Sequence, residues 1–203
     1  MKPAWMLLLL LGCARASAPR PSAQASWPLA EAPKEWQPEI THALESMAEL
    51  QQVLMSRLMA ALEQGDVASA VEVCRKVAQP LSRQTAQTLH LKMGRTSFRL
   101  RNPENAPPAW ARAFVLSGEG RKAADVPGRA WDLGDRVGVL RPIPTANVCL
   151  SCHGEPGVLS PAVSLALEKA YPNDAARGFR EGDLRGFFWA EVQKTPGSGG
   201  DSR

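Results

Sequence analysis

At residues 147–154 the chain reads NVCLSCHG. Cys149 and Cys152 are separated by two residues and His153 follows directly, so the segment has the spacing C-x-x-C-H. Two thiols at this spacing can add across the two vinyl groups of one haem, and the next side chain then lies beneath the iron. The stretch therefore predicts one covalently attached haem c, with Cys149 and Cys152 as attachment residues and His153 as an iron ligand.

Two other interpretations of a C-x-x-C pair are less consistent with the surrounding sequence. A structural zinc site would need a second pair of Cys or His ligands, and the other histidines, His42 and His90, are isolated. A thioredoxin-like motif would lie at a strand-to-helix turn of a βαβ unit. This motif instead follows a proline-broken segment and precedes Gly154 and Pro156. The sequence therefore favours haem attachment.

The composition bounds the class of protein. A chain of 203 residues, 44% of them hydrophobic, is long enough for one domain with a substantial core. The formal net charge is only +4, and lysines and arginines are interspersed with acids, so nucleic acid is not an expected partner. Four cysteines at unequal spacings do not form the pattern of a disulfide scaffold.

Residues 1–18 have the features of an export signal. Lys2 supplies the positive charge, and Met6–Leu11 is an apolar run too short to span a bilayer. The segment ending at Cys13 resembles a bacterial lipobox, although the residue two positions before the cysteine is larger than usual. The alternative is cleavage after the Ala-Ser-Ala sequence at 16–18. We expect a periplasmic protein, anchored to a membrane by lipid on Cys13.

The first half of the remaining chain predicts a linker and two helices. Residues 19–34 contain four prolines among Ala and Ser and are expected to be a linker. Apolar residues recur three, four or seven apart from 35 to 64, which indicates a long amphipathic helix. A second helix is expected from 67 to about 92, bent or divided at Pro80.

Cys74 falls within the apolar stripe of the second helix, so its side chain is expected to point into the core. If Cys13 carries lipid and the motif cysteines carry haem, Cys74 has no partner for a disulfide. It is then either a buried small hydrophobe or the iron ligand opposite His153. The rivals for that second axial position are His90, His42, Met93 and Met47.

The second half predicts short strands and helices. Alternation indicates a strand over 96–100, and proline placement indicates a helix over 107–116. The β-rich run 137–143 contains Pro142, and Pro144 follows it, so it is expected at the edge or end of a sheet, with the haem motif in the loop after it. Further predicted elements are a helix over 161–171, a strand over 184–192 whose alternate residues from Leu184 share one face, and a disordered tail over 194–203.

Arg95, Arg99 and Arg101 cluster in the sequence near a turn at Asn102-Pro103. Haem carries two propionates, and a guanidinium group binds a carboxylate through two parallel hydrogen bonds. The three arginines are therefore candidate haem-binding residues, although any one of them is more often a solvated surface charge.

Several segments taken together resemble a known family. It is a family of single-haem c-type domains with a PAS-like fold, found as standalone periplasmic proteins and as extracytoplasmic parts of sensor kinases. The resemblance covers about residues 40–192, in order. Its pieces are Val73-Cys74, Gly94-Arg95-Thr96-Ser97, Arg101 to Pro107, the haem motif with Gly154, Tyr171-Pro172 with Asp174-Ala175-Ala176 and Gly178-Phe179, and Gly182 to Gly186.

The resemblance implies an α+β fold over residues 35–193, with a PAS-like antiparallel sheet, long N-terminal helices and covalent haem. It also implies that the motif histidine and a cysteine matching Cys74 are the two axial ligands. The implied role is redox or small-molecule sensing, with NO or CO as candidate ligands and an unidentified redox or signalling protein as partner. The alternative is simple electron transfer. An enzyme is not expected: a haem peroxidase is less consistent with the sequence, since His90 is its only candidate distal base.

Overall fold

The computed structural model describes residues 25–65 and 67–195. The expected export signal, Cys13 and the last eight residues lie outside these ranges. Helices and strands follow one another in the order β1 Ser26–Pro28, α1 Gln37–Gln64, α2 Val67–Thr88, β2 Lys92–Thr96, α3 Arg112–Leu116, β3 Arg129–Asp132, β4 Arg136–Pro144, α4 Leu150–His153, α5 Pro161–Ala170 and β5 Leu184–Gln193, with short 3-10 turns between them.

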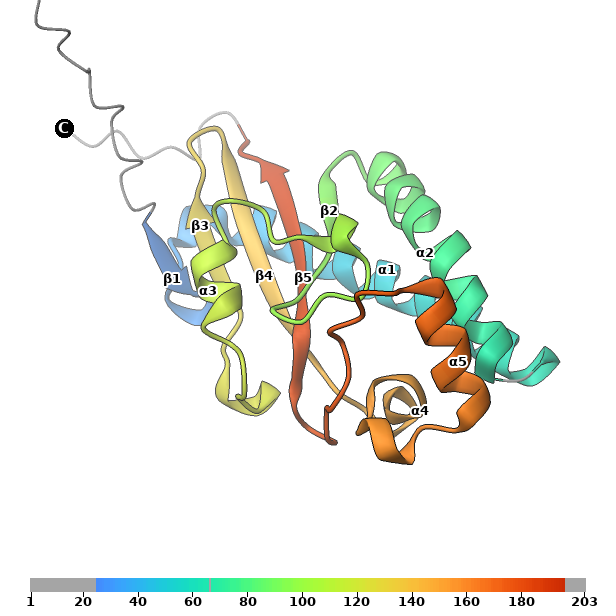
Figure 1. Cartoon of the computed structure of the whole chain (residues 1–203). Coiled ribbons are helices and arrows are strands. Elements are labelled where there is room, and N and C mark those ends of the chain that lie inside the picture. The colour runs from blue at the N-terminus through green and yellow to red at the C-terminus, as the bar shows by residue number, and fades with distance from the viewer. Residues whose placement is uncertain (1–24, 66, 196–203) are drawn as a thin grey trace, which may run out of the picture.

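The strands form one five-stranded sheet in the order β1-β3-β4-β5-β2, and every neighbouring pair is antiparallel. Helix α1 crosses one face of this sheet, and α3 with its flanking loops covers the other (Figure 1). The two faces therefore carry separate cores. Side chains of α1 pack against Val137, Val139, Phe188 and Ala190 on the first face, while Val115, Leu140 and Phe187 pack together on the second. The predicted α+β class is confirmed.

The two predicted N-terminal helices are present as α1 and α2. The first half of α1 is buried against the sheet, with Ala43, Met47 and Leu50 each 0% exposed. Beyond Leu50 the helix extends past the sheet, and its apolar stripe is only partly buried. Pro80 lies inside α2 and does not end it. Among the described residues, no helix is both long enough and apolar enough to cross a bilayer.

Residues 25–34 of the expected linker at 19–34 belong to the folded domain, while residues 19–24 lie outside the described residues. Residues 26–28 form strand β1, which pairs with β3 at the edge of the sheet. Trp27 packs edge-on against Trp36, with ring centroids 5.1 Å apart, and Trp36 is itself buried. The prolines that suggested a linker flank this short strand and two 3-10 turns, since proline suits both edge strands and turns.

Two predicted elements are displaced along the chain. The strand expected at 96–100 is β2 at Lys92–Thr96, because Gly94 interrupts the apolar alternation where it packs against Trp189. A Cβ at residue 94 would lie 3.0 Å from the Trp189 ring nitrogen. The helix expected at 107–116 begins only at Arg112, because the preceding residues form a 3-10 turn capped by Asn102 and further turns.

Strand β4 is central in the sheet and not at its edge. Its prolines nevertheless lie at the C-terminal end of the strand, as predicted. Strand β3 pairs only with residues 137–140, so from Arg141 onward β4 has β5 as its single neighbour. Pro142 and Pro144 lie in this part of β4, which has a neighbouring strand on one side only. The missing backbone N–H of a proline can there point away from β5, where no strand needs it.

Strand β5 has apolar residues on both faces because both faces of the sheet are covered, and a bulge interrupts its pairing with β4 near its start. Ile143 pairs with Gly186 and Pro144 with Leu184, so Arg185 is the extra residue. The insertion reverses the alternation, and Leu184 joins the core on the α3 side while Phe188 faces α1. The prediction that Leu184 shares a face with Phe188 is therefore wrong.

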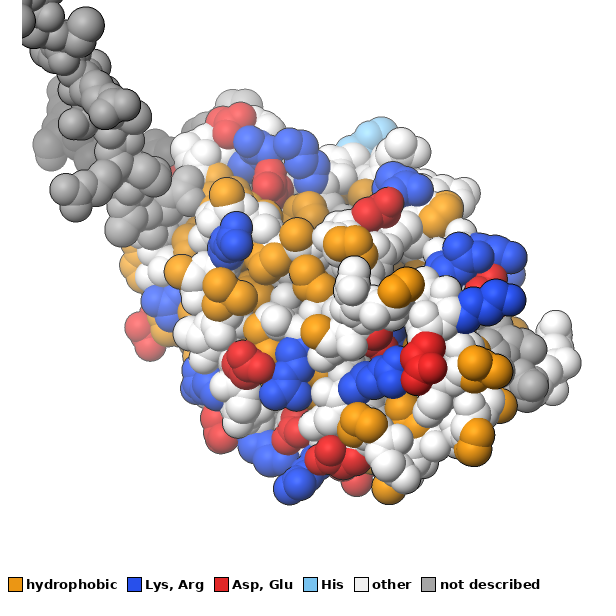
Figure 2. Space-filling view, in the orientation of Figure 1, with side chains coloured by type: hydrophobic (Ala, Val, Ile, Leu, Met, Phe, Trp, Pro, Cys, Tyr) orange, Lys and Arg blue, Asp and Glu red, His pale blue; other side chains and the backbone are white. Residues whose placement is uncertain are grey.

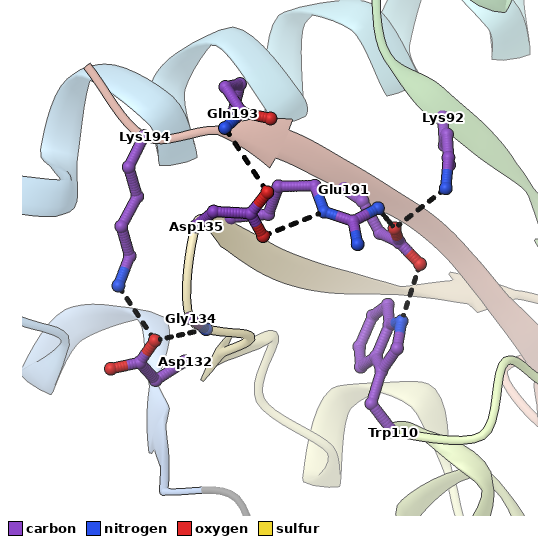
Figure 3. A network of polar contacts seen from close by, with 9 residues as sticks. Lys92, Trp110, Asp132, Gly134, Asp135, Glu191, Gln193 and Lys194 are labelled. Carbon is purple, nitrogen blue, oxygen red and sulfur yellow. Dashed lines mark hydrogen bonds and ion pairs between the residues drawn. The ribbon is translucent and has the colours of Figure 1, made fainter. Parts of the chain in front are cut away.

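A polar network ties four strands together at the end of the sheet far from the haem motif (Figure 3). The carboxylate of Glu191 accepts from the Trp110 indole at 3.0 Å and pairs with Lys92 at 3.8 Å and with Arg136. Lys194, expected in a disordered tail, bonds to Asp132 at 2.7 Å. The folded chain therefore continues at least to Thr195. The network holds the strands together at one end of the sheet, and the haem motif lies at the other end.

Candidate haem site

The haem motif follows directly from β4. Residues 147–149 form a 3-10 turn, and Leu150–His153 form the single turn of helix α4. Gly154 ends that helix, and two backbone bonds then hold the segment to a later loop, from Gly178 N to Gly154 O at 2.9 Å and from Phe179 N to His153 O at 3.0 Å. The motif lies after a strand, as the sequence predicted, but it is a helical turn and not a loop.

The ring of His153 is oriented by the backbone. Its Nδ1 lies 2.7 Å from the carbonyl oxygen of Ala176, which can only accept, so Nδ1 carries the proton. Burial, followed by the positive charges of Arg185 and Arg101, lowers the pKa of His153 well below its ordinary value. The imidazole is therefore neutral, with the lone pair of Nε2 available to a metal, which is the arrangement found at metal-binding histidines.

His153 faces a cavity of about 350 Å³ between the α1–α2 pair and the motif end of the sheet. This volume is within the range of cofactor pockets. Most of its wall is apolar. It comes from the parts of the apolar stripes of α1 and α2 that the sheet does not cover, together with Ile143, Val148 and Phe188. Both motif cysteines line the same cavity. The structure thus brings the predicted attachment residues and the predicted iron ligand to one pocket.

Cys74 lines this cavity as well, which corrects the prediction that it points into the core. Its side chain is exposed, and the surface it exposes faces the pocket. The pocket shields the thiol from bulk solvent, and this desolvation raises its pKa, whereas the charges of Arg95 and Arg101 act in the opposite direction. An apolar helical stripe gives the same signal whether its neighbour is a protein core or a cofactor, so the sequence could not distinguish them.

The rivals for the second axial position are all outside the cavity. Met47 and Met93 are buried in the core between α1 and the sheet. His42 and His90 are exposed, and neither lines the pocket. Within the described residues no group of three or more His, Cys, Asp or Glu side chains could hold a metal ion, so the zinc interpretation has no second ligand pair there.

Arg101 lines the cavity, but its guanidinium group is already bonded to other groups of the protein. Its guanidinium pairs with Asp174 at 3.1 Å and donates to the carbonyl oxygen of Cys152 at 2.6 Å. Asp174 is only 1% exposed, and it also accepts from the backbone of Ala176, whose carbonyl holds His153. Arg101 and Asp174 therefore form a clamp that positions both the motif backbone and the His153 ring.

Arg99 also lines the cavity and is also engaged. It donates to Glu119 at 3.0 Å and to the carbonyl of Arg177 at 3.2 Å, and it lies over the ring of Phe179. Arg185 stacks on Phe179 too, at 5.0 Å from the ring centroid. The edge of this ring in turn approaches His153, at 6.4 Å between centroids. The aromatic side chain thus connects two cavity arginines with the candidate ligand.

Arg95 and Arg185 are the arginines with unmet charge. Neither forms an ion pair with any carboxylate of the described residues, and no Asp or Glu lines the cavity. Burial, then the neighbouring charges of Arg101 and Arg95, lower the pKa of Arg185 to about 9. Burial also lowers the pKa of Arg95. A dianionic, largely apolar ligand would compensate these charges, and haem with its two propionates has those properties.

Sequence reasoning found Arg95 but missed Arg185. The residue reaches the cavity through the bulge in β5, and its only sequence signal is the adjacent Gly186. That glycine has φ = 151°, and a Cβ there would lie 2.2 Å from the carbonyl oxygen of Thr96. Glycine inside a strand pattern is a known indication of a bulge, and bulges redirect side chains.

Comparison with known families decides the relationship. The sequence model of the Tll0287-like family matches residues 30–192, four-fifths of the chain. The chain belongs to the Tll0287-like family. The predicted resemblance is thereby confirmed, and the matched range contains β2, β3, β4, nearly all of β5, both long helices and all the residues that line the cavity.

The Tll0287-like fold is also seen in a solved structure, described as the crystal structure of the cyanobacterial heme-protein Tll0287. The match has a TM-score of 0.54 at 22% sequence identity, and it covers 81% of this chain and 98% of that chain. Among curated proteins no match was found. The shared architecture supports the predicted fold class, while the roles of Cys74, His153 and the arginines stay predictions.

Proposed function

We propose that this protein is an exported c-type haem protein that acts as a redox- or gas-responsive module. One haem would be held by thioether bonds to Cys149 and Cys152, with His153 and Cys74 as axial ligands. Arg95 and Arg185 would neutralise the propionates. Family membership supports haem as the cofactor, because the Tll0287-like family includes a cyanobacterial haem protein.

The observation that carries this proposal is the presence of Cys74 and His153 in one cavity with both motif cysteines. A thiol and an imidazole are the two donors, the wall around them is apolar, and the charged residues that line it are all arginines. This combination matches the needs of an anionic iron porphyrin and of few other ligands.

A thiolate ligand favours ferric iron and lowers the reduction potential of a haem. The chain's own contribution to a response is the placement of Cys74 on α2, a helix that packs against α1 and α5. A change in the bond to Cys74 would bias the position of that helix, and a partner protein could read the change.

Substituting Cys74→Ala tests the ligand assignment. We expect covalent haem to remain, because Cys149 and Cys152 are unchanged, while the thiolate signature of the ferric protein disappears from its optical and EPR spectra. The protein should be co-expressed with a cytochrome c maturation system and measured as the purified ferric form. His42→Ala and Met93→Leu are matched controls, since neither residue lines the cavity, and both should keep the wild-type spectrum. A wild-type ferric spectrum in the Cys74→Ala variant would contradict the proposal.

Electron transfer is the second candidate function, and one observation favours it. Residues 155–158, which follow the motif directly, are exposed, so the attached edge of a haem would lie close to solvent, as electron transfer to a protein partner requires. The midpoint potential and the binding of CO and NO to the reduced form separate the two functions. A potential well above that of thiolate haems, without gas binding, would favour electron transfer.

A peroxidase is not proposed. The described cavity wall contains His153 as its single histidine, and His90, the candidate distal base of a peroxidase, does not line it. General acid–base cleavage of a peroxide therefore has no evident catalytic group. The partner we propose is a redox or signalling protein, with CO or NO as candidate small ligands.

We further propose export to the periplasmic side and lipid attachment at Cys13. Folded wild-type protein should fractionate with membranes and shift in mass by its lipid, and the Cys13→Ser variant should be soluble with its haem retained. The measurement is membrane fractionation with intact-mass spectrometry. A wild-type protein cleaved after Ala18 would contradict the anchor and leave export intact.

A further inference from the structure

We propose that Met55 is a second sulfur ligand of the haem iron, which occupies the axial position when Cys74 does not. The inference rests on the proposed function, because it presupposes that the cavity holds haem. Met55 is the one methionine among the described residues whose side chain lines this cavity.

The position of Met55 follows from the geometry of the helical hairpin. Helix α1 ends at Gln64 and α2 begins at Val67, and the two helices pack against each other. At a rise of 1.5 Å per residue, Met55 lies ~14 Å from the end of α1 and Cys74 lies ~11 Å from the start of α2. The two sulfur-bearing residues are therefore within about one helical turn of the same level, on facing helices, and both line the pocket.

The chemistry of the two side chains is complementary. Methionine has an unbranched chain with several rotatable bonds, so its sulfur can change position without movement of the helix. A thioether is neutral and raises the potential of a haem, whereas a thiolate lowers it. A reduced iron would therefore bind Met55 more favourably relative to Cys74 than an oxidised iron would.

The other potential donors are less suitable, and of those considered only Tyr171 lines the described cavity wall. The ring of Tyr171 has the Arg101 guanidinium over it at 5.8 Å, and burial raises the pKa of its phenol, which disfavours the phenolate that binds iron. Met47 and Met93 are in the core, and Met59 is 41% exposed on α1 without lining the cavity.

The exchange of Cys74 for Met55 at the iron requires one electron from an external donor. That donor, dithionite in the test, reduces ferric to ferrous iron. The bond from iron to Cys74 breaks with its electron pair on sulfur, and the sulfur takes a proton from solvent. A lone pair of the Met55 thioether forms the new bond. Oxidation and loss of the proton reverse the exchange.

The test compares Cys74→Ala, Met55→Leu and the double variant in the mature haem protein. With Cys74 removed, the ferric iron should stay low-spin with the charge-transfer band of a methionine ligand, and the double variant should become high-spin. In the reduced protein, Met55→Leu alone should accelerate CO binding by about tenfold or more, because no ligand then has to leave first. Met59→Leu, on the same helix, should match wild type in every measurement.

The outcomes separate the two proposals. If Cys74→Ala is already high-spin with water as ligand, and Met55→Leu leaves CO binding unchanged, Met55 is not a ligand while the Cys74 assignment stands. If Cys74→Ala keeps the wild-type ferric spectrum, the Cys74 assignment itself fails. If haem is not bound by the wild-type chain, the proposed function fails before either variant is made.

Discussion

Substituting Asp174→Asn is expected to lower the free energy of unfolding by about 3–5 kcal/mol, the usual cost of removing one partner from a buried ion pair. Asp174 is 1% exposed and holds Arg101, Arg177 and the backbone of Ala176. The amide side chain keeps the volume but loses the charge, so the Arg101 guanidinium is left buried without its counterion. Chemical denaturation of the haem-loaded protein measures the change.

The matched control for Asp174→Asn is Glu119→Gln. Glu119 pairs with Arg99 at 3.0 Å, but its side chain is 56% exposed. An exposed pair contributes about 0–1 kcal/mol, so the control should remain close to wild type. Equal losses in the two variants would show that the burial of Asp174 is not what makes its ion pair important. The Asp174 variant should also broaden or shift the spectrum of the haem, because the carbonyl of Ala176 orients His153.

Acid should weaken the same clamp. Burial alone would raise the pKa of Asp174, but hydrogen bonds and charge from Arg101 outweigh it, and the net pKa is lowered. The carboxylate therefore contributes stability above its unfolded pKa, near 4, and this contribution is lost as the pH falls through the lower folded value. The stability difference between wild type and Asp174→Asn should accordingly shrink below about pH 4.

Substituting Gly186→Ala is expected to destabilise the protein by about 2–4 kcal/mol. The residue has φ = 151°, a region that residues with a Cβ rarely adopt. Its new Cβ would also meet the carbonyl oxygen of Thr96 at 2.2 Å, and that oxygen is backbone in the neighbouring strand. The pairing of β2 with β5 must then open, or the bulge at Arg185 must be lost.

Two measurements test the Gly186 prediction. Thermal unfolding should show the loss of stability, and the midpoint potential of the haem should change, because Arg185 leaves its place in the cavity. Gly157→Ala is the control, since a Cβ at residue 157 would meet nothing within 4 Å. An unchanged potential with lowered stability would contradict the link between the bulge and the cavity charge.

The features that the sequence revealed are those that depend on local spacing. The C-x-x-C-H spacing brings Cys149, Cys152 and His153 to one short helical turn, and the apolar period predicted α1 and α2 within a few residues at each end. Arg95, Arg99 and Arg101 all line the cavity because they lie on one strand end and the loop that follows it.

The features that the sequence did not reveal depend on tertiary context. Met55 lies in an apolar stripe with the pattern of an ordinary core helix. This part of α1 faces a cavity because the sheet ends before it, and the sequence does not show where the sheet ends. Arg185 depends on a bulge, and the engagement of Arg101 depends on an aspartate 73 residues away. Strand β1 was missed because prolines on either side of a three-residue strand resemble a linker.

The four arginines of the cavity also concern how the protein matures. Without haem, Arg95 and Arg185 repel Arg101 across a pocket whose lining contains no acid. Haem that binds only the folded chain stabilises it by mass action. The covalent attachment that we propose would make this stabilisation permanent. Folding and haem binding are then coupled, because the sheet and helices form the pocket and the cofactor supplies the negative charge that the pocket lacks.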